Sequence, residues 1–427
     1  MRKVRGTRDI ISFDSYIDFF GKIREHLGLY SFTEIHTPLF EFESVFAKNL
    51  GEMSDIVSKE MYYISHVHTS LEEEKIVLRP ELTASVVRAF LENGIQESPW
   101  RVFSCGPVFR HERPQQGRFR EFFQVTIEIL DAMHSAHDIE LISMIFSFFQ
   151  KIIPDLFTLE LNYLGTTHER KAYKSALYSY CISKKELFPV EYIEELSEKN
   201  ILRILDHKND SVKNALREAP LLREFLQEES LSKFNFIITT LEKLNISYTF
   251  NPRLIRGLDY YTGLVFEFSS SLLGSQNAIA GGGRYDKLAE QMGSKKEIPA
   301  LGVGIGVDRV LLLLEQMGKE KNIPFKKLVG IVIAIENESS NLLYAQAISL
   351  VRLLTSQNIS TLSYFDKTSL KSALRKANQD EVDYIVILSE KSLISATYIL
   401  KYMKEKKEQE ELSIANIILK IKNINGF

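Results

Sequence analysis

Cysteine is scarce in this sequence of 427 residues, which contains only Cys105 and Cys181. Two thiols cannot build the disulfide framework of a small secreted domain, so we expect a reducing, cytoplasmic setting. Paired cysteines are missing too, and the nine histidines are scattered, which argues against a structural zinc site. No apolar run approaches the ~20 residues that span a bilayer, and no apolar segment follows the basic start MRKVRGTRDI. We therefore expect neither a membrane helix nor a secretory signal.

An excess of one charge is also missing, because 53 Lys+Arg face 56 Asp+Glu and the formal net charge is −3. This balance argues against a protein that coats nucleic acid through charge alone. Residues 326–427, however, hold 14 Lys+Arg and 11 Asp+Glu, a net of +3, which leaves −6 for the rest. A mildly basic C-terminal part is compatible with local RNA contact, although on charge alone a solvated surface is the simpler explanation.

The length predicts two or three domains, because one core rarely serves so many residues. The polar stretch 318–327, which contains Pro324, is typical of a linker. We therefore expect one domain over 1–325 and a second over 326–427. Within the first, the charged and glycine-poor stretch from about 168 to 235 predicts a helical insertion.

Periodicity predicts the main elements. Apolar residues at helical spacing predict helices over 14–29, 138–152 and 307–317. In the second domain, apolar runs at 329–335 and 382–388 predict buried strands on either side of a helix at 342–357. Alternation of strands and helices predicts a small α/β domain with a mainly parallel sheet.

The segment from Trp100 to Asp131 predicts two strands joined by a polar loop. Period two on the second strand places an amide and a carboxylate on one face, and an apolar core face opposite. The first face holds Phe122, Gln124, Thr126 and Glu128, and the second holds Phe123, Val125, Ile127 and Ile129. The first strand leads to Arg110, whose rigid fork suits phosphate or carboxylate. We expect a pocket that binds an anion and a polar ligand, although a half-exposed hairpin with a polar outer face is the commoner case.

Two segments are rich in glycine, AIAGGGRYDKL (278–288) and LGVGIGVDRVLLLL (301–314). In the second, Gly302, Gly304 and Gly306 alternate with apolar residues, so one strand face is bare backbone. A bare face suits the stacking of a planar base, and Arg309 in the helix that follows suits a phosphate. Close packing of another element is an equally good explanation, and the spacing is not the dinucleotide fingerprint.

Together these segments resemble the class II aminoacyl-tRNA synthetases, and within them the histidyl-tRNA synthetase family, over nearly the whole chain. The segments that carry the resemblance are RGTRDI (5–10), TPLFEFESVFAKNLGE (37–52), LRPELTASVVRAF (78–90), FRHERPQQGRFREFFQ (109–124), LIRGLDYYTGLVFEF (254–268), AGGGRYDKL (280–288) and GVGIGVDRVLLLL (302–314). Their joint order is far more specific than any single match. The resemblance implies an α+β fold, with an antiparallel-sheet catalytic domain that carries the helical insertion, plus a C-terminal α/β anticodon-binding domain.

The resemblance also implies a reaction, the ligation of L-histidine to tRNA(His) through a histidyl-adenylate, with ATP as substrate and Mg²⁺ as its ion. It assigns Arg110 and Arg256 to catalysis at the α-phosphate. The residues that it assigns to histidine are Glu81, Thr83, Gln124, Glu128, Tyr260 and Tyr261. Those that it assigns to ATP are Arg110, Glu112, Arg113 and Arg309. It places Arg113 and Gln115 at the acceptor end of the RNA, leaves the metal ligands unknown, and implies a homodimer with Pro38 at its interface.

Four positions depart from the usual pattern of the family, and one of them is Asp308, which stands where glutamate is common and keeps the sign of the charge. Leu82 stands where bacterial members usually have glycine, Phe123 replaces a histidine, and Thr126 replaces a glycine on the pocket face. We expect Thr126 to narrow the pocket or to reshape its water structure. In the second domain, Tyr364 and Phe365 are candidates for stacking on anticodon bases, although either is compatible with a core position.

Two alternatives share the fold. One is a synthetase-like regulatory subunit of ATP phosphoribosyltransferase, which binds histidine but usually lacks the tail domain and the arginines. The presence of Arg110, Arg256 and Arg309 argues against it. The other is a class II synthetase for a different amino acid, and the segment RGLDYY argues for histidine.

Overall fold

The computed structural model describes residues 2–47, 60–64, 74–113, 117–189, 196–198, 200–206, 209–256, 260–318, 328–333, 341–365, 369–405 and 407–423. The chain divides into two units, Met1–Glu320 and Lys321–Phe427. The boundary predicted between 325 and 326 lies outside the described residues. Among these, no helix combines the length and the apolar character that crossing a membrane requires.

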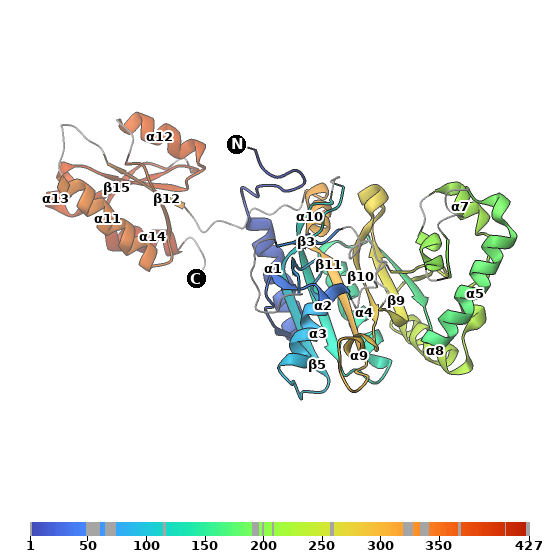
Figure 1. Ribbon diagram of the computed structural model, residues 1–427. Helices are drawn as coiled ribbons and strands as arrows, with labels where there is room; N and C mark the ends of the chain where they lie inside the picture. The colour runs from blue at the N-terminus through green and yellow to red at the C-terminus, as the bar shows by residue number, and fades with distance from the viewer. Residues whose placement is uncertain are drawn as a thin grey trace. The chain divides into compact units, whose positions relative to one another are not determined.

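An eight-stranded sheet forms the centre of the first unit (Figure 1). Its order is β1 (Thr33–Glu34), β5 (Trp100–Phe109), β6 (Glu121–Leu130), β11 (Ala300–Gly306), β10 (Ala278–Arg284), β9 (Thr262–Ser269), β7 (Thr158–Tyr163) and β8 (Thr249–Phe250). The six central strands pair antiparallel, whereas β1 and β8 join the edges in parallel. The predicted hairpin and the antiparallel catalytic sheet are therefore confirmed.

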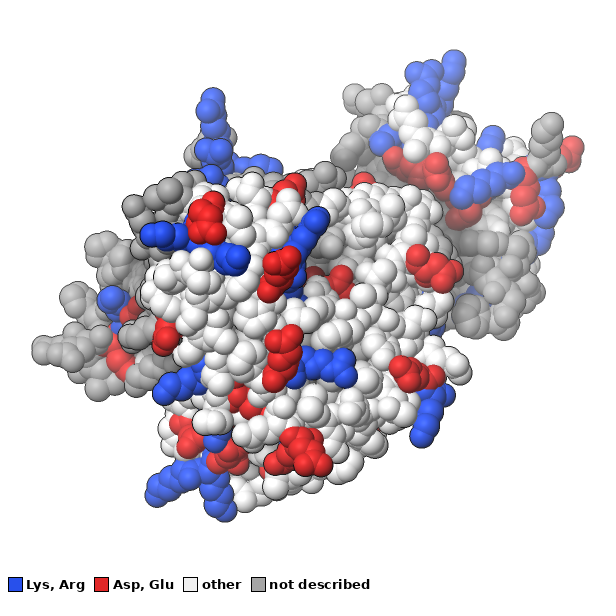
Figure 2. Space-filling model, turned by 90° about the vertical axis from the view of Figure 1, so that its right-hand side faces the viewer, with Lys and Arg blue, Asp and Glu red and all other residues white. Residues whose placement is uncertain are grey.

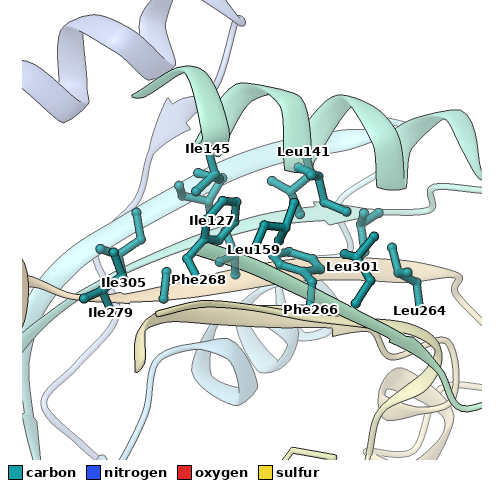
Figure 3. Packing of buried hydrophobic residues seen from close by; sticks show 14 of the residues in the cluster. Ile127, Leu141, Ile145, Leu159, Leu264, Phe266, Phe268, Ile279, Leu301 and Ile305 are labelled. Carbon is teal, nitrogen blue, oxygen red and sulfur yellow. The ribbon is translucent and has the colours of Figure 1, made fainter. Parts of the chain in front are cut away.

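Helices bury one face of this sheet. They are α1 (Asp14–Leu29), α4 (Ala136–Ile152) and α10 (Val307–Gln316), close to the predicted ranges. In Figure 3, Leu141 and Ile145 of α4 point towards Ile127 and Leu159 on the strands. The apolar residues of α4 recur at spacings of three and four, which gives the helix one continuous stripe for the sheet.

Smaller elements surround the other parts of the sheet. A three-stranded sheet has the order β2 (Phe40–Phe42), β4 (Ile76–Leu78) and β3 (Tyr62–Tyr63). The first unit also contains four shorter helical elements, which are α2 (Ser44–Ala47), α3 (Thr83–Glu92), η5 (Ser271–Gln276) and α9 (Leu288–Gln291). Helix α3 begins beside the β5–β6 hairpin, and this position brings Glu81 and Thr83 to the site described below.

The regular elements described between β7 and β8 are all helical. They are α5 (Thr167–Ser183), η2 (Lys185–Leu187), η3 (Ile201–Asp206), α7 (Asp210–Ala215), η4 (Leu222–Phe225) and α8 (Glu228–Lys243). The buried carboxylate of Glu169 joins the two long helices. It closes a capping box with Thr166 at the start of α5, and it accepts from Gln227 N at 2.5 Å and Ser230 Oγ at 2.9 Å at the start of α8.

The second unit holds a five-stranded sheet in the order β13 (Ser360–Ser363), β12 (Leu328–Ile333), β14 (Tyr384–Leu388), β15 (Thr397–Tyr402) and β16 (Glu410–Ser413). Its helices are α11 (Asn341–Ser356), α12 (Leu370–Gln379), α13 (Glu390–Ser395) and α14 (Ile414–Asn423). The first three strands are parallel, but β15 and β16 are antiparallel, so the predicted mainly parallel sheet is correct only in part. Strand β15 alternates buried and half-buried residues, and a search for continuous apolar runs therefore misses it.

The two aromatic residues proposed to stack on anticodon bases lie on the core side. Tyr364 is 6% exposed, and its hydroxyl donates to Asp380 at 3.1 Å. Phe365 is half-buried and makes an edge contact with Tyr344, with 5.8 Å between ring centroids. The stacking prediction is wrong for Tyr364, because a base cannot reach a buried ring.

Candidate active site

A pocket lies where the β5–β6 hairpin meets β10, β11 and the starts of α3 and α10. Nine residues that the sequence analysis assigned to the site line it, and these are Glu81, Thr83, Arg110, Glu112, Gln124, Arg256, Tyr260, Tyr261 and Arg309. The sheet thus gathers residues that are far apart in sequence. Three predicted residues are not among those that line the pocket. Glu128 is fully buried, Arg113 is exposed, and Gln115 lies outside the described residues.

Arg110 and Arg256 face this pocket from different segments. The Nε group of Arg110 donates to the carbonyl of Pro80 at 2.8 Å, and its guanidinium lies 5.3 Å from the ring centre of Phe122. Arg256 pairs with Glu267 on β9 and lies over Gly281, where a Cβ atom would come within 2.2 Å of the guanidinium. Burial lowers the pKa of Arg110. Burial acts in the same direction on Arg256, but Glu267 together with Tyr261 and Tyr260 leaves the pKa of Arg256 raised.

Arg309 adds a third guanidinium. It donates to the carbonyl of Ala278 at 2.6 Å and to that of Gly117 at 3.3 Å. Burial and the nearby cations Arg118 and Arg110 lower its pKa to about 10. Carbonyl dipoles orient this cation without neutralising it, so the pocket is electrostatically prepared for an anion with several charges.

Arg118, which belongs to the segment FRHERPQQGRFREFFQ but was given no role from the sequence, lines the same pocket. It pairs with Glu112, whose carboxylate also lies 3.9 Å from Nη1 of Arg110. Burial lowers the pKa of Arg118. Four arginines therefore converge on one pocket, and this convergence is its strongest electrostatic feature.

A buried carboxylate, that of Glu128, lies on the same face of β6 as Gln124. Three hydroxyl groups surround it, from Thr83 at 2.6 Å, from Thr126 and from Tyr285. Burial raises the pKa of Glu128 to about 8, although these hydroxyls act in the opposite direction. The side chain fits because its neighbour on β11 is Gly302, where a Cβ atom would lie 1.6 Å from Oε2.

Glu81 is the second buried carboxylate of the site. Its two oxygens accept from the backbone N–H groups of Thr83 and Ala84, each at 2.7 Å, so that it caps helix α3. Burial raises its pKa, while the nearby Arg110 acts to lower it. An acceptor held this rigidly is suited to a ligand with an ammonium group.

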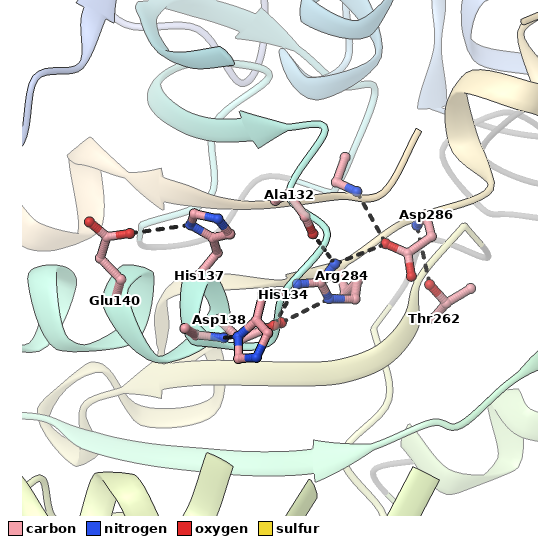
Figure 4. A network of polar contacts seen from close by, with 10 residues as sticks. Ala132, His134, His137, Asp138, Glu140, Thr262, Arg284 and Asp286 are labelled. Atoms are coloured by element: carbon pink, nitrogen blue, oxygen red, sulfur yellow. Dashed lines mark hydrogen bonds and ion pairs between the residues drawn. The ribbon is translucent and has the colours of Figure 1, made fainter. Parts of the chain in front are cut away.

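The site includes a tyrosine that the sequence analysis missed, Tyr285. It is fully buried and directs its hydroxyl to Glu128. The residues on either side hold it in place (Figure 4): Arg284 bonds to Asp138 at 2.5 Å and to the carbonyl of Ala132 at 2.8 Å. Asp286 accepts from the N–H of Ala300 at 3.1 Å. The segment GGGRYD was recognised, but only the structure shows which of its side chains reaches Glu128.

All three of the departures at Leu82, Phe123 and Thr126 lie at packed positions of the structure. Phe123 packs against Phe13, Tyr16 and Phe20, with centroids 5.2–6.0 Å apart, and so belongs to the core face of β6. Thr126 is buried and places its hydroxyl 3.2 Å from that of Thr83. Leu82 is fully buried just before α3.

The glycine-rich strands β10 and β11 serve mainly to make room. A Cβ atom at Gly304 would lie 2.7 Å from Nε2 of Gln124, and one at Gly282 would lie 2.1 Å from the carbonyl of Gly302. Close packing is therefore the role the structure gives to Gly282, Gly302 and Gly304. Gly304 and Gly306 also line the pocket, and a stacking floor for a base stays a prediction.

Asp308 at the start of α10 ties the N-terminal segment to the site. It accepts from the N–H of Phe123 at 2.8 Å and from the hydroxyl of Tyr16 at 2.6 Å, and it pairs with Arg8. Arg8 and Asp308 are 300 residues apart in the chain. No local pattern could have predicted this pairing.

The sheet is mainly antiparallel, and its pocket receives arginines from a strand–loop–strand hairpin and from the helix after a glycine-rich strand. This combination defines the catalytic domain of a class II aminoacyl-tRNA synthetase. Residues 19–310 match the family described as histidyl-tRNA synthetase, and residues 329–424 match the anticodon binding domain. The chain therefore belongs to the histidyl-tRNA synthetase family.

Individual relatives agree with this assignment. The chain is 38% identical over 415 residues to a histidine–tRNA ligase of Thermodesulfovibrio yellowstonii, and the matched region covers 95% of each protein. It is 37% identical to a histidine–tRNA ligase of Chlorobium phaeobacteroides, and the matched region covers 98% of this chain and 96% of the relative. The crystal structure of apo histidyl-tRNA synthetase from S. aureus has a TM-score of 0.78 and 25% identity, and it covers 99% of this chain and 100% of that one.

A further solved structure shares the fold alone. It is described as an ATP phosphoribosyltransferase regulatory subunit/histidyl-tRNA synthetase from Bacillus halodurans, with a TM-score of 0.63 and 19% identity. It covers 91% of this chain and 98% of its own length.

Proposed function

We propose that this chain ligates L-histidine to tRNA(His) in two steps in the pocket described above. A carboxylate oxygen of histidine bonds to the α-phosphorus of ATP, and the bond from that phosphorus to the bridging oxygen breaks and releases diphosphate. A hydroxyl of the terminal ribose of the RNA then attacks the histidyl carbonyl and releases AMP. The observation that carries this proposal is the convergence of four arginines beside two buried carboxylates.

In the first step, Arg110 and Arg256 bracket the α-phosphate and stabilise the charge that develops on its oxygens. Their directions are fixed before the substrate binds, Arg110 by the carbonyl of Pro80 and Arg256 by Glu267. Reactions of this kind need positioning and charge stabilisation more than covalent help. Both arginines are thus assigned to catalysis.

The remainder of ATP extends along the hairpin. Arg309 binds the γ-phosphate, and Glu112 with Arg113 contacts the adenine and the phosphate tail. Among the described residues, no cluster of three metal-ligating side chains occurs. Mg²⁺ would therefore be held chiefly by triphosphate oxygens and water, which is a common mode for this ion.

Histidine binds on the other side of Arg110. Glu81, Thr83 and Gln124 hold its ammonium and carboxylate groups, and Glu128 with Tyr260 and Tyr261 binds the ring. A neutral imidazole offers one donor and one acceptor. Buried polar partners penalise any ligand that leaves them unpaired, so this slot rejects apolar amino acids of similar size.

The RNA binds outside the pocket. Arg113, together with Gln115, contacts the acceptor end, the unit Lys321–Phe427 binds the anticodon, and the helical insertion contacts the RNA stem. We also propose a cytoplasmic homodimer. Its support is the exposed apolar face of the three-stranded sheet, where Phe40 is 58% and Phe42 38% exposed, close in sequence to Pro38.

The test is ATP–diphosphate exchange by the purified protein with a panel of amino acids. Exchange that depends on histidine and on no other amino acid is expected. Exchange with a different amino acid would move the chain to another specificity. Complete absence of exchange with every amino acid would favour a histidine-binding regulatory subunit.

A further inference from the structure

The start of the chain carries an unusual concentration of positive charge. Arg2, Lys3, Arg5 and Arg8 fall within the first eight residues, and the first acid is Asp9. The first three of these cations are exposed, and none of them forms an ion pair with another residue that the structure describes. They are therefore available to a polyanion.

This segment is held in place. The backbone N–H of Arg120 donates to the carbonyl of Gly6 at 2.9 Å, and the guanidinium carbon of Arg8 lies 3.9 Å from the ring centre of Phe119. A turn closes in front of this contact, since both the N–H and the hydroxyl of Thr7 donate to the carbonyl of Val4, at 3.1 and 2.8 Å. The segment that carries the three exposed cations is thus anchored to the hairpin loop.

The contact between this segment and the hairpin loop lies at the rim of the pocket. Phe119 and its neighbour Arg118 line the pocket, and Asp308, which pairs with Arg8, lines it too. Any RNA that brings its terminal ribose to a histidyl group in the pocket must pass this rim. Its adjoining phosphates then come close to the loop and to the segment that the loop anchors.

The local charge favours such an approach. Besides the three exposed cations, the hairpin presents Arg113 and Arg120, whereas the exposed acids nearby in sequence are Asp9 and Glu121. Elsewhere the pattern is different. On the face seen in Figure 2, basic and acidic side chains are interspersed, and no large area of one sign stands out.

We propose that Arg2, Lys3 and Arg5 form a phosphate-binding arm that holds the backbone of the acceptor stem while the end of the RNA enters the pocket. The proposal rests on the function proposed above, because it takes RNA as the second substrate. The arm reads charge and not sequence, since its exposed side chains contact phosphates and no base edges. It adds affinity and orientation without taking part in histidine activation.

The test compares the full-length protein with the variant Lys3→Gln/Arg5→Gln in binding a tRNA(His) transcript at several salt concentrations. Each phosphate contact contributes about 0.7 to 0.9 to the slope of log affinity against log salt. Loss of two contacts should lower the slope by roughly 1.4 to 1.8, and the advantage of the unmodified protein should shrink roughly tenfold between about 50 and 200 mM salt. Histidine-dependent diphosphate exchange should stay unchanged.

Lys295→Gln/Lys296→Gln is the matched control. Both lysines are exposed and precede Ala300, which pairs with Leu130 at the end of β6 far from the hairpin loop. An unchanged slope in Lys3→Gln/Arg5→Gln, or an equal drop in the control, overturns the arm. A loss of diphosphate exchange in Lys3→Gln/Arg5→Gln overturns it as well, because the segment would then support the pocket. If the unmodified protein lacks exchange, the failure lies with the proposed function instead.

Discussion

At the scale of single residues, the site depends on groups whose charge the fold controls. Glu128 is surrounded by the hydroxyls of Thr83, Thr126 and Tyr285, and the titratable groups near it are Glu81, Tyr260 and Tyr261. Burial and the charge of Glu81 favour the neutral acid, whereas the hydroxyls favour the carboxylate. The hydroxyl of Thr126 therefore acts to lower the pKa of Glu128 against the effect of burial.

Thr126→Val should impair histidine use in a pH-dependent way. The pKa of Glu128 is raised to about 8, so the carboxylate that is proposed to accept from the imidazole N–H is formed as pH rises through that value. Removing one donor to the carboxylate raises this pKa further, and the acid limb of kcat/KM for histidine should move to higher pH. The measurement is a pH profile of diphosphate exchange.

Thr126→Ser is the matched variant, because it keeps the hydroxyl and should keep the limb in place. Equal profiles for the valine and serine variants would show that the hydroxyl has no influence on Glu128.

At the scale of elements, the glycine-rich strands shape the site because they lack side chains where other groups approach closely. A Cβ atom at Gly302 would collide with Oε2 of Glu128 and would also lie 2.9 Å from the carbonyl of Ile127. Gly21 in α1 is different, since a Cβ atom there meets nothing within 4 Å.

Gly302→Ala should therefore displace Glu128 and raise KM for histidine at least tenfold, equivalent to roughly 1.4 kcal/mol, with little change in KM for ATP. Overpacking should also lower the free energy of unfolding by about 1–3 kcal/mol. The control Gly21→Ala should raise it by up to about 1 kcal/mol, because glycine is a poor helix former. Steady-state kinetics and chemical denaturation check both variants, and an unchanged KM for histidine in Gly302→Ala would contradict this role.

Periodicity was sufficient to predict the elements with a continuous apolar face. Helix α1, the β5–β6 hairpin and strand β14 all fall close to their predicted positions, because each buries one regular stripe or run. Strand β15 was missed because its buried residues alternate with half-buried ones, and strand β16 was missed because Leu412 is its only apolar residue. The sequence alone could not decide whether Tyr364 faces a base or the core, because an aromatic ring suits both.

Some residues of the site could likewise be predicted from the sequence, and others could not. Motif resemblance located most residues that line the pocket, because they lie in short segments with fixed spacing. Tyr285 and the pairing of Arg8 with Asp308 depend on which way a side chain points and on contacts between distant segments. Such contacts arise from the tertiary fold and leave no local pattern.

At the scale of the whole molecule, the two units are proposed to divide the work. The residues that line the pocket all belong to Met1–Glu320, and the match to the anticodon binding domain lies in Lys321–Phe427. On this proposal, activation of histidine needs only the first unit, whereas recognition of the RNA needs both.

Deletion of Lys321–Phe427 should therefore reduce aminoacylation at least about tenfold more than it reduces diphosphate exchange, a difference of roughly 1.4 kcal/mol. Both rates are measured on the same preparation, with circular dichroism to confirm that the first unit is folded. Equal losses in the two rates would indicate that the second unit acts by stabilising the first.

Arg110 and Arg256 are proposed to act together on the α-phosphate of ATP. The most direct test of this proposal is histidine-dependent diphosphate exchange by Arg256→Ala, with Arg101→Ala as control, because Arg101 forms an ion pair with Glu140 and is not among the residues that line the pocket. We predict that Arg256→Ala retains its fold and loses about two to three orders of magnitude in rate, whereas Arg101→Ala stays close to the unmodified protein. A folded Arg256→Ala variant with near-normal exchange would contradict the account.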